Sequence, residues 1–363
     1  MGLKEAANKI LCRWMKGTGP NDNIVVGSRI RLARNIAKVP FPATASEGQL
    51  AHVGDLVRMA TVANGQSNMD YLAIAEMPRL ERELLVEKHL ISPQQTRDVK
   101  HKAVVLGRDE LVSIMVNEED HLRIQSICPG FQLESAWEQC NQVDDTLGDS
   151  LEYAFSPELG YLTACPTNVG TGLRASVMLH LPVLTMTQQM QRAIPAINKL
   201  GLAVRGLYGE GTEAVGNVYQ ISNQLTLGHS EQEIIQHLAT VARQIIDQEE
   251  SGRKQLLEVG KAQLEDRTYR SLGVLSQARV ISSQEAMQLL SEVWLGVDLG
   301  LIKELDPKTL KSLVVLIRPA HLQKIIGKEM DTGERDGFRG DLVREYIRMG
   351  AKEKDSELKE GES

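Results

Sequence analysis

The sequence predicts an α+β protein in which strands and helices are mixed up to about residue 250 and helices alone follow. Apolar runs rich in Val and Ile, typical of strands, occur at 103–106 and 111–116. Gly107-Arg108-Asp109 joins these two runs and predicts a hairpin turn, hence antiparallel pairing. Amphipathic spacing predicts helices over 46–64, 79–98 and 132–150.

Beyond residue 250 only helical patterns remain. A capping box at Ser230–Glu233 predicts a helix to about Glu250, and a second capping box at 282–285 and the pair Asp306-Pro307 predict further helix starts. With 363 residues the chain is long enough for two domains. We therefore predict a first domain over 1–255, an all-helical domain over 256–351 and a disordered polar tail over 352–363.

Composition and charge argue against several classes of protein. The net charge of −7 disfavours broad nucleic-acid binding but leaves room for a local basic pocket that takes a small anion. No apolar run approaches the roughly 20 residues that a membrane-spanning helix needs. The four cysteines show no metal-binding spacing. These features are typical of a cytoplasmic protein with reduced thiols.

The segment Asn117-Glu118-Glu119-Asp120-His121-Leu122-Arg123 places three consecutive carboxylates between two apolar runs. Side chains alternate along a strand, so at least one carboxylate is expected to face inward, towards a cleft or a cation. Arg123 is a candidate for that cation. The alternative is an acidic connection that is simply solvated.

A strand expected over 24–34 carries Arg29 and Arg31 on one face, with Ile30 and Leu32 on the other. Two neighbouring guanidinium groups repel each other, and an anion between them relieves the repulsion. Polyphosphate is a natural candidate, because arginine binds phosphate oxygens with paired hydrogen bonds. The alternative is a solvated strand face.

Two glycine-rich segments follow. In the first, a strand near residue 160 leads through Cys165-Pro166 and Gly170-Thr171-Gly172 to a helix expected from Leu173, whose N-terminus and Arg174 suit an anion. The spacing fits a dinucleotide fingerprint, but no acidic residue lies in 188–208, so we reject that interpretation. Cys165 is either a small buried hydrophobe or a thiol activated by the anion site. The second segment, 205–213, is a loop with Arg205 at its root and Glu210 within it, or else a plain flexible turn.

Four segments together resemble the phosphagen (guanidino) kinase family. They are GSRIRLARN at 27–35, NEEDHLR at 117–123, LTACPTNVGTGLRA at 162–175 and RGLYGEGTE at 205–213. The resemblance implies an antiparallel sheet flanked by helices, and transfer of the γ-phosphoryl of Mg-ATP to a guanidinium nitrogen. The helical C-terminal region with Arg335-Asp336-Gly337-Phe338-Arg339-Gly340 is similar to the branch of bacterial protein arginine kinases, which phosphorylate arginine side chains of proteins. Two positions depart from the family pattern: Gly27 stands where Ser is usual, and Gly340 where Ala is usual.

The resemblance also implies roles for individual residues. Glu119 and Glu210 match the two catalytic carboxylates that orient the acceptor guanidinium and take its proton. Cys165 matches a reactive cysteine, to which we assign substrate positioning. Arg335, Asp336 and Arg339 match an allosteric phosphoarginine site, and His89 matches a position near the adenine. The residues expected to bind the nucleotide are Ser28, Arg29, Ile30, Arg31, His89, Arg123, Arg174, Ala175, Ser176, Val177, Met178, Arg205, Gly206, Leu207, Tyr208 and Gly209.

By resemblance the cofactors are ATP and Mg²⁺ carried by the nucleotide, with no metal site of the protein's own. Protein substrates with exposed arginine, a zinc-binding activator, a stress-gene repressor and a Clp unfoldase are the expected partners, and a homodimer is the expected assembly. The implied role is marking proteins for Clp-type degradation and controlling a stress regulon. Two alternatives stay open: a kinase for free arginine or another small guanidine, and a non-catalytic phosphoarginine-binding adaptor.

Overall fold

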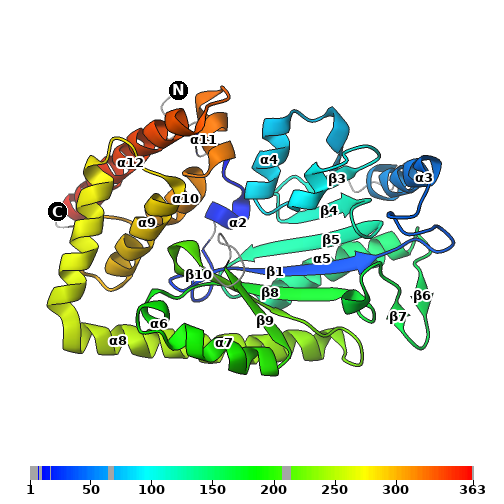
Figure 1. Cartoon of the computed structure of the whole chain (residues 1–363), viewed down its shortest axis with the longest axis horizontal. Coiled ribbons are helices and arrows are strands. Elements are labelled where there is room, and N and C mark those ends of the chain that lie inside the picture. The colour runs from blue at the N-terminus through cyan, green and yellow to red at the C-terminus, as the bar shows by residue number, and fades with distance from the viewer. Residues whose placement is uncertain (1–6, 8–9, 17, 64–68, 207–213, 362–363) are drawn as a thin grey trace.

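The computed structural model describes all residues except 1–6, 8–9, 17, 64–68, 207–213 and 362–363. It contains an eight-stranded antiparallel sheet beside a helical region (Figure 1). The strand order is β2-β3-β4-β5-β1-β8-β10-β9, so β1 lies near the middle of the sheet. The strands are β1 Val25–Arg34, β2 Met69–Ala73, β3 Ala103–Gly107, β4 Val112–Val116, β5 Leu122–Pro129, β8 Leu173–His180, β9 Leu202–Gly206 and β10 Val218–Asn223, with β6 Phe155–Ser156 and β7 Gly160–Tyr161 forming a separate pair.

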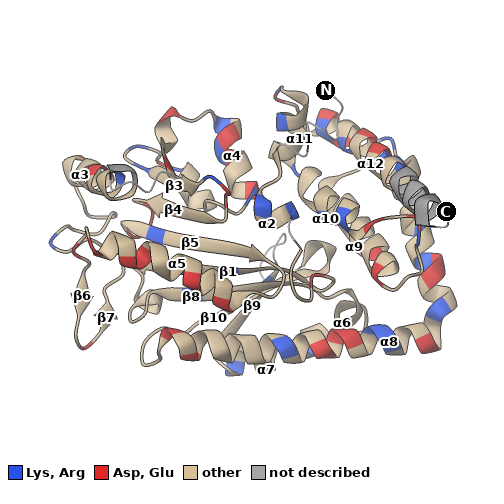
Figure 2. Cartoon of the chain, turned by 180° about the vertical axis from the view of Figure 1, so that it is seen from behind, with Lys and Arg blue, Asp and Glu red and all other residues tan. Residues whose placement is uncertain are grey.

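One face of this sheet is apolar and is covered by helices. Helix α5, Leu133–Gly148, packs on β1 and β5, and the long helix α8, Glu231–Gln277, packs on β8 and β10. Ile30 and Leu32 of β1 are fully buried in the resulting core. Acidic and basic residues are interspersed along the outer side of α8 (Figure 2), as expected for a helix with one face in the core and the other in water. The opposite face of the sheet carries polar side chains.

Smaller helices complete the part of the structure around the sheet. They are α2 Arg13–Lys16, α3 Glu47–Arg58, α4 Arg79–Glu87, α6 Pro182–Met186 and α7 Gln189–Lys199. The helical region follows α8 and consists of α9 Ser283–Asp298, α10 Pro307–Leu316, α11 Pro319–Ile326 and α12 Thr332–Gly361. Within the described residues, none of these helices combines the length and the apolar character needed to cross a lipid bilayer.

Two helix predictions differ from the structure: the helix expected from Leu173 is wrong, and the helix expected over 79–98 is too long. The helix expected from Leu173 is instead strand β8, which pairs with β1 on one side and β10 on the other and buries its apolar residues in the sheet core. The helix expected over 79–98 ends at Glu87. There the backbone turns at His89, which has a φ of +60°, and Leu90 and Ile91 enter a separate core under α4.

The expected domain boundary after residue 255 falls inside α8. The capping box at Ser230 starts this helix as predicted, because Ser230 Oγ accepts from the Glu233 N–H and Glu233 accepts from the Ser230 N–H. The helix then continues to Gln277 and changes direction where the backbone of Gly260 leaves the helical conformation (Figure 1). Where one domain ends and the next begins therefore stays a prediction.

Helix α12 runs to Gly361, through most of the segment 352–363 that the sequence predicts to be a disordered polar tail, and the disorder of that segment stays a prediction. The residues of α12 from Ala351 onwards are mostly Ala, Lys, Glu and Leu, which have high helix propensity. In this segment Lys and Glu recur at spacings that favour pairing along a helix.

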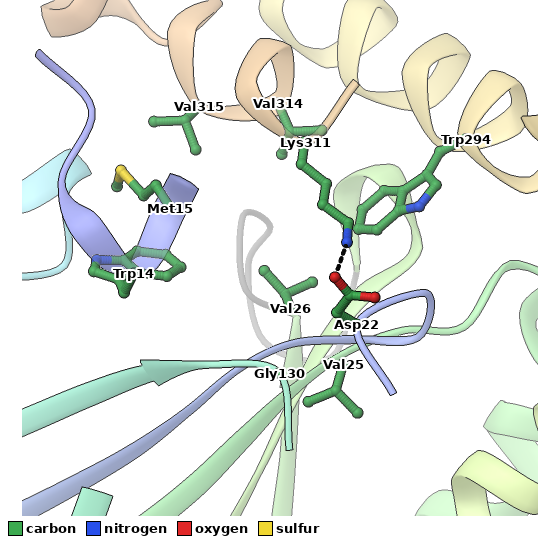
Figure 3. Close-up of a pocket in the computed structure, with 10 residues that line it drawn as sticks. All are labelled: Trp14, Met15, Asp22, Val25, Val26, Gly130, Trp294, Lys311, Val314 and Val315. Carbon is green, nitrogen blue, oxygen red and sulfur yellow. Dashed lines mark ion pairs between the residues drawn. The ribbon is translucent and has the colours of Figure 1, made fainter. Parts of the chain in front are cut away.

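The helical region packs directly on the start of β1. A small cavity of about 30 Å³ lies where α2, β1, α9 and α10 meet, and Figure 3 shows the residues that line it. Across it, Lys311 Nζ lies 2.9 Å from an Asp22 carboxylate oxygen and 5.9 Å from the centroid of the Trp294 ring. The Trp294 ring also stacks on the ring of His180 of β8, with 4.2 Å between the two ring centroids. Sheet and helical region therefore share one continuous contact.

The departure from the family pattern at Gly340 has a physical reason. A Cβ atom on Gly340 would lie 2.7 Å from the carbonyl oxygen of Arg279, so the chain between α8 and α9 approaches α12 too closely for alanine. We expect Gly340→Ala to lower the free energy of unfolding by about 1–3 kcal/mol, measured by urea denaturation. Gly337→Ala is the matched control: its Cβ has no neighbour within 4 Å, and we expect a gain of up to about 1 kcal/mol. Equal effects of the two substitutions would contradict this account.

Candidate active site

A cavity of about 750 Å³ lies over the polar face of the sheet. Its lining is strongly basic, with two carboxylates in addition. Among the described residues, the charged side chains that line it are Arg29, Arg31, Lys102, Arg123, Arg174, Arg205, Arg318, Glu118 and Glu119. Polar uncharged residues of the sheet, Gln125 and Gln220, also contribute. This concentration of cations on an otherwise acidic protein identifies a site for a polyanion.

The strand register brings most of these arginines together. Arg31 of β1 lies opposite Gln125 of β5 and opposite Arg174 of β8. Arg205 of β9 lies opposite Gln220 of β10, and Gln220 accepts a hydrogen bond of 2.6 Å from Arg29 Nη2. Because side chains alternate along each strand, residues two apart reach the same face. The predicted common face of Arg29 and Arg31 is confirmed.

The guanidinium groups destabilise one another in the absence of an anion. Burial lowers the pKa of Arg29 to about 10, with further lowering by the positive charges of Arg174 and Arg123. Burial lowers the pKa of Arg31 still further, and Arg29 and Arg123 act in the same direction while Glu118 opposes them. A bound polyphosphate would supply the missing negative charge. The site is therefore built for an anionic ligand.

The acidic segment is the turn between β4 and β5, and it points two carboxylates at one arginine. Arg123 Nη1 lies 2.7 Å from a Glu118 oxygen, and its Nη2 donates to Glu119 over 3.2 Å. The Glu118 side chain is only 5% exposed and also accepts from Ser92 Oγ at 2.9 Å. The Glu119 side chain is 45% exposed and keeps free space in front of it. The expectation of an inward carboxylate paired with Arg123 is confirmed, with Glu118 as the more buried of the two.

A buried network holds this turn against the segment that carries Cys165. Asp120 Oδ1 accepts from Asn35 Nδ2 and from the Ala164 N–H, both at 2.7 Å. Asn35 also accepts from the His121 N–H at 2.9 Å. The third carboxylate of the acidic segment is therefore structural, and it fixes Glu119 relative to Cys165.

Cys165 lies at the end of this segment, beside the cavity. Its side chain is half-buried, its Sγ is 3.0 Å from Thr167 Oγ1, and it lies close enough to Arg174 to interact with that guanidinium electrostatically. The turn after it requires glycine, since a Cβ on Gly170 would lie 2.4 Å from the carbonyl oxygen of Thr226, and Gly170 has a φ of +111°. A tightly packed turn, and not a helix N-terminus, leads to Arg174.

His89 lines the cavity from the turn after α4. Gln125 Nε2 donates to its carbonyl oxygen at 2.7 Å, and its ring lies 5.8 Å from the ring of Trp14. Burial, helped by the charges of Arg29 and Arg318, holds the pKa of His89 well below its usual range. The ring is therefore neutral at pH 7 and suited to contact an uncharged group.

The expected nucleotide-binding residues divide into three groups. Arg29, Arg31, His89, Arg123, Arg174, Arg205 and Gly206 line the cavity. The side chains of Ile30, Ala175 and Val177 lie in the core on the opposite face of the sheet, Met178 packs in the core of the helical region, and Ser28 and Ser176 are fully buried in hydrogen bonds to the backbone. Leu207, Tyr208, Gly209 and the catalytic candidate Glu210 lie outside the described residues. Alternation along β1 and β8 explains why Ile30, Ala175 and Val177 face the core. Ser176 and Met178 share the face of Arg174, but Ser176 is fully buried and Met178 is covered by the helical region.

Arg335, Asp336 and Arg339 lie on α12, away from this cavity. Arg339 is almost fully buried, pairs with Asp336 and donates to the carbonyl oxygens of Ile317 and Ile281, both at 2.8 Å. Arg335 lies at a second cavity of about 410 Å³ between α4 and α12, where it donates to the Met330 carbonyl at 2.7 Å. Arg339 thus joins α12 to two other segments, and of the three residues it is Arg335 that lines the second cavity.

Sequence reasoning missed six polar residues that line the cavity: Ser92, Gln94, Lys102, Gln125, Gln220 and Arg318. A signal for Gln125 exists, since it follows Arg123 by two residues in the same strand. The contribution of Gln220 depends on the pairing of β10 with β9, and that of Arg318 depends on the packing of α11. Neither can be inferred from local spacing.

The buried histidines predict a pH dependence of stability. Burial is the largest cause that lowers the pKa of His89, His121, His180 and His321 in the folded protein. In the unfolded chain a histidine titrates near about 6.5, so below this pH the unfolded state binds protons that the folded state does not. Stability is therefore complete above pH 6.5 and falls below it, by at most about 1.4 kcal/mol per pH unit for each fully buried histidine.

Asp298 has the opposite effect on stability as the pH falls. Burial raises the pKa of Asp298 to about 6, so the folded protein gains a proton there that the unfolded chain does not bind. We expect the four histidines to outweigh it, and urea denaturation to show a net loss of stability between pH 6.5 and 5.5. His180→Asn should reduce this slope. Stability that is constant or rises over that interval would contradict the burial of the histidines.

Comparison with known proteins agrees with this geometry. The family model of the ATP:guanido phosphotransferase C-terminal catalytic domain matches residues 52–252, and that of the protein-arginine kinase McsB C-terminal domain matches residues 261–358. The protein-arginine kinase of Halothermothrix orenii is 51% identical over 96% of this chain and 100% of its own length. That of Symbiobacterium thermophilum is 51% identical over 95% of this chain and 99% of its own.

This chain belongs to the protein-arginine kinase family.

Solved structures place the fold in the same wider family. A crystal structure of lombricine kinase matches with a TM-score of 0.57 and 28% identity, over 70% of this chain and 76% of that chain. The duplicated taurocyamine kinase of Schistosoma mansoni has the same fold, with a TM-score of 0.58 over 75% of this chain and 40% of that chain. The resemblance drawn from the sequence, and the antiparallel sheet flanked by helices that it implied, are confirmed. The match to the catalytic-domain model ends at residue 252 and the match to the C-terminal-domain model begins at residue 261. The boundary predicted after residue 255 lies between these two positions.

Proposed function

We propose that the chain transfers the γ-phosphoryl group of Mg-ATP to arginine side chains of proteins. The observation that carries this proposal is the cavity in which arginines from the four strands β5, β1, β8 and β9 and the turn carboxylate Glu119 face the same space. Phosphoryl transfer is catalysed mainly by positioning and by stabilisation of charge, and this arrangement supplies both. The names of the curated relatives support a protein arginine as the acceptor.

The basic side chains would bind the phosphates of ATP. Arg29 and Arg31 extend from β1, Arg174 from the adjacent β8, and Arg205 from β9, which β10 separates from β8. Arg123 is held beside the acidic turn by Glu118. Bidentate contacts from arginine suit the oxygens of a chain of phosphates. The Mg²⁺ that accompanies the nucleotide would neutralise part of the charge on the β- and γ-phosphates. Guanidinium groups placed in this way stabilise the charge that is redistributed as the γ-phosphoryl moves.

Glu119 would act on the acceptor. An arginine side chain has a pKa above about 12 and is protonated at pH 7, so its nitrogen is a poor nucleophile. A carboxylate beside it can orient the guanidinium and take one proton as the nitrogen–phosphorus bond forms and the bond from the γ-phosphorus to the bridging oxygen breaks. ADP leaves with the electrons of that bond. The 45% exposure of the Glu119 side chain leaves it open to an incoming arginine.

The reaction is tested by incubating the full chain with radiolabelled Mg-ATP and an unfolded protein substrate. We expect acid-labile label on the protein, and none on the same protein with its arginines replaced by lysine. Label transferred to free arginine but not to protein would instead establish a small-guanidine kinase. Absence of transfer to either acceptor, with retained binding of phosphoarginine, would favour the adaptor.

The role of Cys165 can be separated from covalent catalysis. We expect Cys165→Ser and Cys165→Ala to keep measurable turnover, with kcat lowered by about tenfold to a hundredfold through loss of substrate positioning. Cys128, which is buried in the sheet core, provides a control, and Cys128→Ala should leave kcat within about twofold. Complete loss of turnover in Cys165→Ser would indicate a covalent role.

The finer expectations stay predictions. Allosteric binding of phosphoarginine at Arg335, Asp336 and Arg339, a homodimer, a zinc-binding activator, a stress-gene repressor and a Clp unfoldase all belong to this group, as does a role in degradation and the stress response. For the phosphoarginine site, Arg335→Ala is the informative variant, because Arg335 faces a cavity while Arg339 is committed to backbone carbonyls. Unchanged affinity for phosphoarginine in Arg335→Ala would remove the allosteric hypothesis.

A further inference from the structure

The cavity over the sheet is completed by a residue of the helical region. Arg318 lies outside the segment that matches the guanidino phosphotransferase domain, which ends at residue 252, and inside the C-terminal match over 261–358. It nevertheless lines the same cavity as Arg29, Arg31 and His89. The helical region therefore adds one cation to a site that the sheet provides.

The backbone of Arg318 is fixed at the joint between two helices. Its N–H donates to the Val315 carbonyl of α10 at 3.1 Å, and its own carbonyl accepts from the Leu322 N–H of α11 at 3.0 Å. Pro319 follows at the first helical position, which restricts the backbone further. A side chain that begins at such a joint has a defined origin, and less entropy is lost when it binds a ligand.

Glu87 of α4 fixes this joint relative to the cavity. Its buried carboxylate accepts from the Ala320 N–H at 2.9 Å and from the His321 N–H at 3.0 Å, and it lies 2.8 Å from His321 Nδ1. Leu80 and Leu84 of α4 pack on Ala320 alongside it. Figure 1 shows α11 beside α4. Glu87 precedes His89 by only two positions, so the start of α11 and the His89 end of the cavity are held together.

The charge of Arg318 reaches this end of the cavity. It contributes to lowering the pKa of both His89 and His321, and Arg29 acts on His89 in the same direction. One oxygen of the nearby Glu87 carboxylate accepts a hydrogen bond from the Ala320 N–H, and the other accepts from the His321 N–H and lies beside His321 Nδ1. Arg318 adds a positive charge to the cavity that Arg29 and Arg31 also line, and a bound anion would offset that charge.

We propose that Arg318 is a nucleotide-binding residue, which contacts ATP at the His89 end of the cavity through the phosphate nearest the adenosine. This inference rests on the proposed function, since it takes ATP as the ligand. The arginines of β1, β5, β8 and β9 hold the outer phosphates, and Arg318 extends the row of cations towards His89. The helical region thereby takes part directly in binding the nucleotide.

The test is the dissociation constant of nucleotides for the full chain, measured by calorimetry. We expect Arg318→Ala to lower the affinity for Mg-ATP and for Mg-ADP by about tenfold or more each, because both nucleotides contain the phosphate nearest the adenosine. The hydrogen bonds that are lost join charged groups and are therefore strong. Arg318→Lys, which keeps the charge but not the paired donors, should lie between Arg318→Ala and the unsubstituted protein. In Arg318→Ala the affinity for inorganic tripolyphosphate should fall by less than the affinity for ATP.

Lys324→Ala is the matched control. Lys324 is a cation on the same helix, but it pairs with Glu81 outside the cavity, so its removal should leave nucleotide affinity unchanged within about twofold. Equal affinity for ATP in Arg318→Ala and the unsubstituted protein would overturn the inference, as would an equal loss in Lys324→Ala. If the protein binds ATP more tightly than Arg318→Ala but transfers no phosphate to protein arginine, the proposed function fails and this inference stands.

Discussion

Glu119→Gln should lower kcat for phosphoryl transfer by about 10²–10⁴-fold while the affinity for Mg-ATP changes little. This magnitude is typical for the loss of a positioned general base. Glutamine keeps the size of the side chain but cannot accept the proton that the acceptor guanidinium releases. A steady-state assay with a saturating protein substrate measures kcat, and calorimetry with Mg-ATP measures the affinity.

The neighbouring carboxylate provides the comparison. Glu118 is buried against Arg123 and Ser92, and its role is to hold Arg123 in place. We therefore expect Glu118→Gln to weaken nucleotide binding and to lower kcat by less than Glu119→Gln does. The account would be contradicted if Glu119→Gln kept more than a tenth of the activity, or if Glu118→Gln were the more damaging of the two.

Arg34→Met should destabilise the protein by about 3–5 kcal/mol, because it leaves a buried carboxylate without its partner. The Arg34 side chain is 1% exposed, and its Nε and Nη2 donate to the two oxygens of Asp144 at 2.6–3.1 Å. Its Nη1 also donates to the Thr171 carbonyl at 2.9 Å, and its guanidinium lies 3.5 Å from the centroid of the Tyr161 ring. Urea denaturation measures the change.

Two variants separate the buried charge from other effects. In Arg34→Met combined with Asp144→Leu the buried Asp144 carboxylate is removed together with its partner, so this protein should be more stable than Arg34→Met alone. Glu231, which lies 3.7 Å from Arg34, keeps its hydrogen bond from Trp137 in both variants. Lys38→Ala breaks an ion pair with Glu152 in which both side chains are largely exposed, and it should cost no more than about 1 kcal/mol. A cost below about 1 kcal/mol for Arg34→Met would show that the pair does not hold the central strand to α5.

The periodicity of the sequence predicted the parts of the site that depend on one strand. The alternation in β1 placed Arg29 and Arg31 on one face, and it also implies that Ile30 points into the core, although family resemblance had included Ile30 among the nucleotide-binding residues. Arg174 was expected in the site but on a helix. The glycine turn before it suggested a helix start, whereas pairing with β1 and β10 makes the segment a strand.

The remaining parts of the site depend on contacts between distant segments. Glu118 and Glu119 are adjacent in the sequence, and only the packing of the turn against Ser92 decides which of them is buried. Arg318 enters the cavity because Glu87, more than two hundred residues earlier, caps the helix that follows it. Local spacing carries no information about such pairs, since propensity and periodicity describe one element at a time.

The central claim is that the arginines on the polar face of the sheet hold the transferring phosphoryl group next to Glu119. The most direct measurement is a crystal structure of the full chain with Mg-ADP, nitrate and an arginine-containing peptide, in which planar nitrate occupies the place of the moving phosphoryl group. The account predicts nitrate among Arg123, Arg174 and Arg205, with the peptide guanidinium against Glu119. Nucleotide phosphates bound outside this cavity, or a peptide guanidinium away from Glu119, would contradict it.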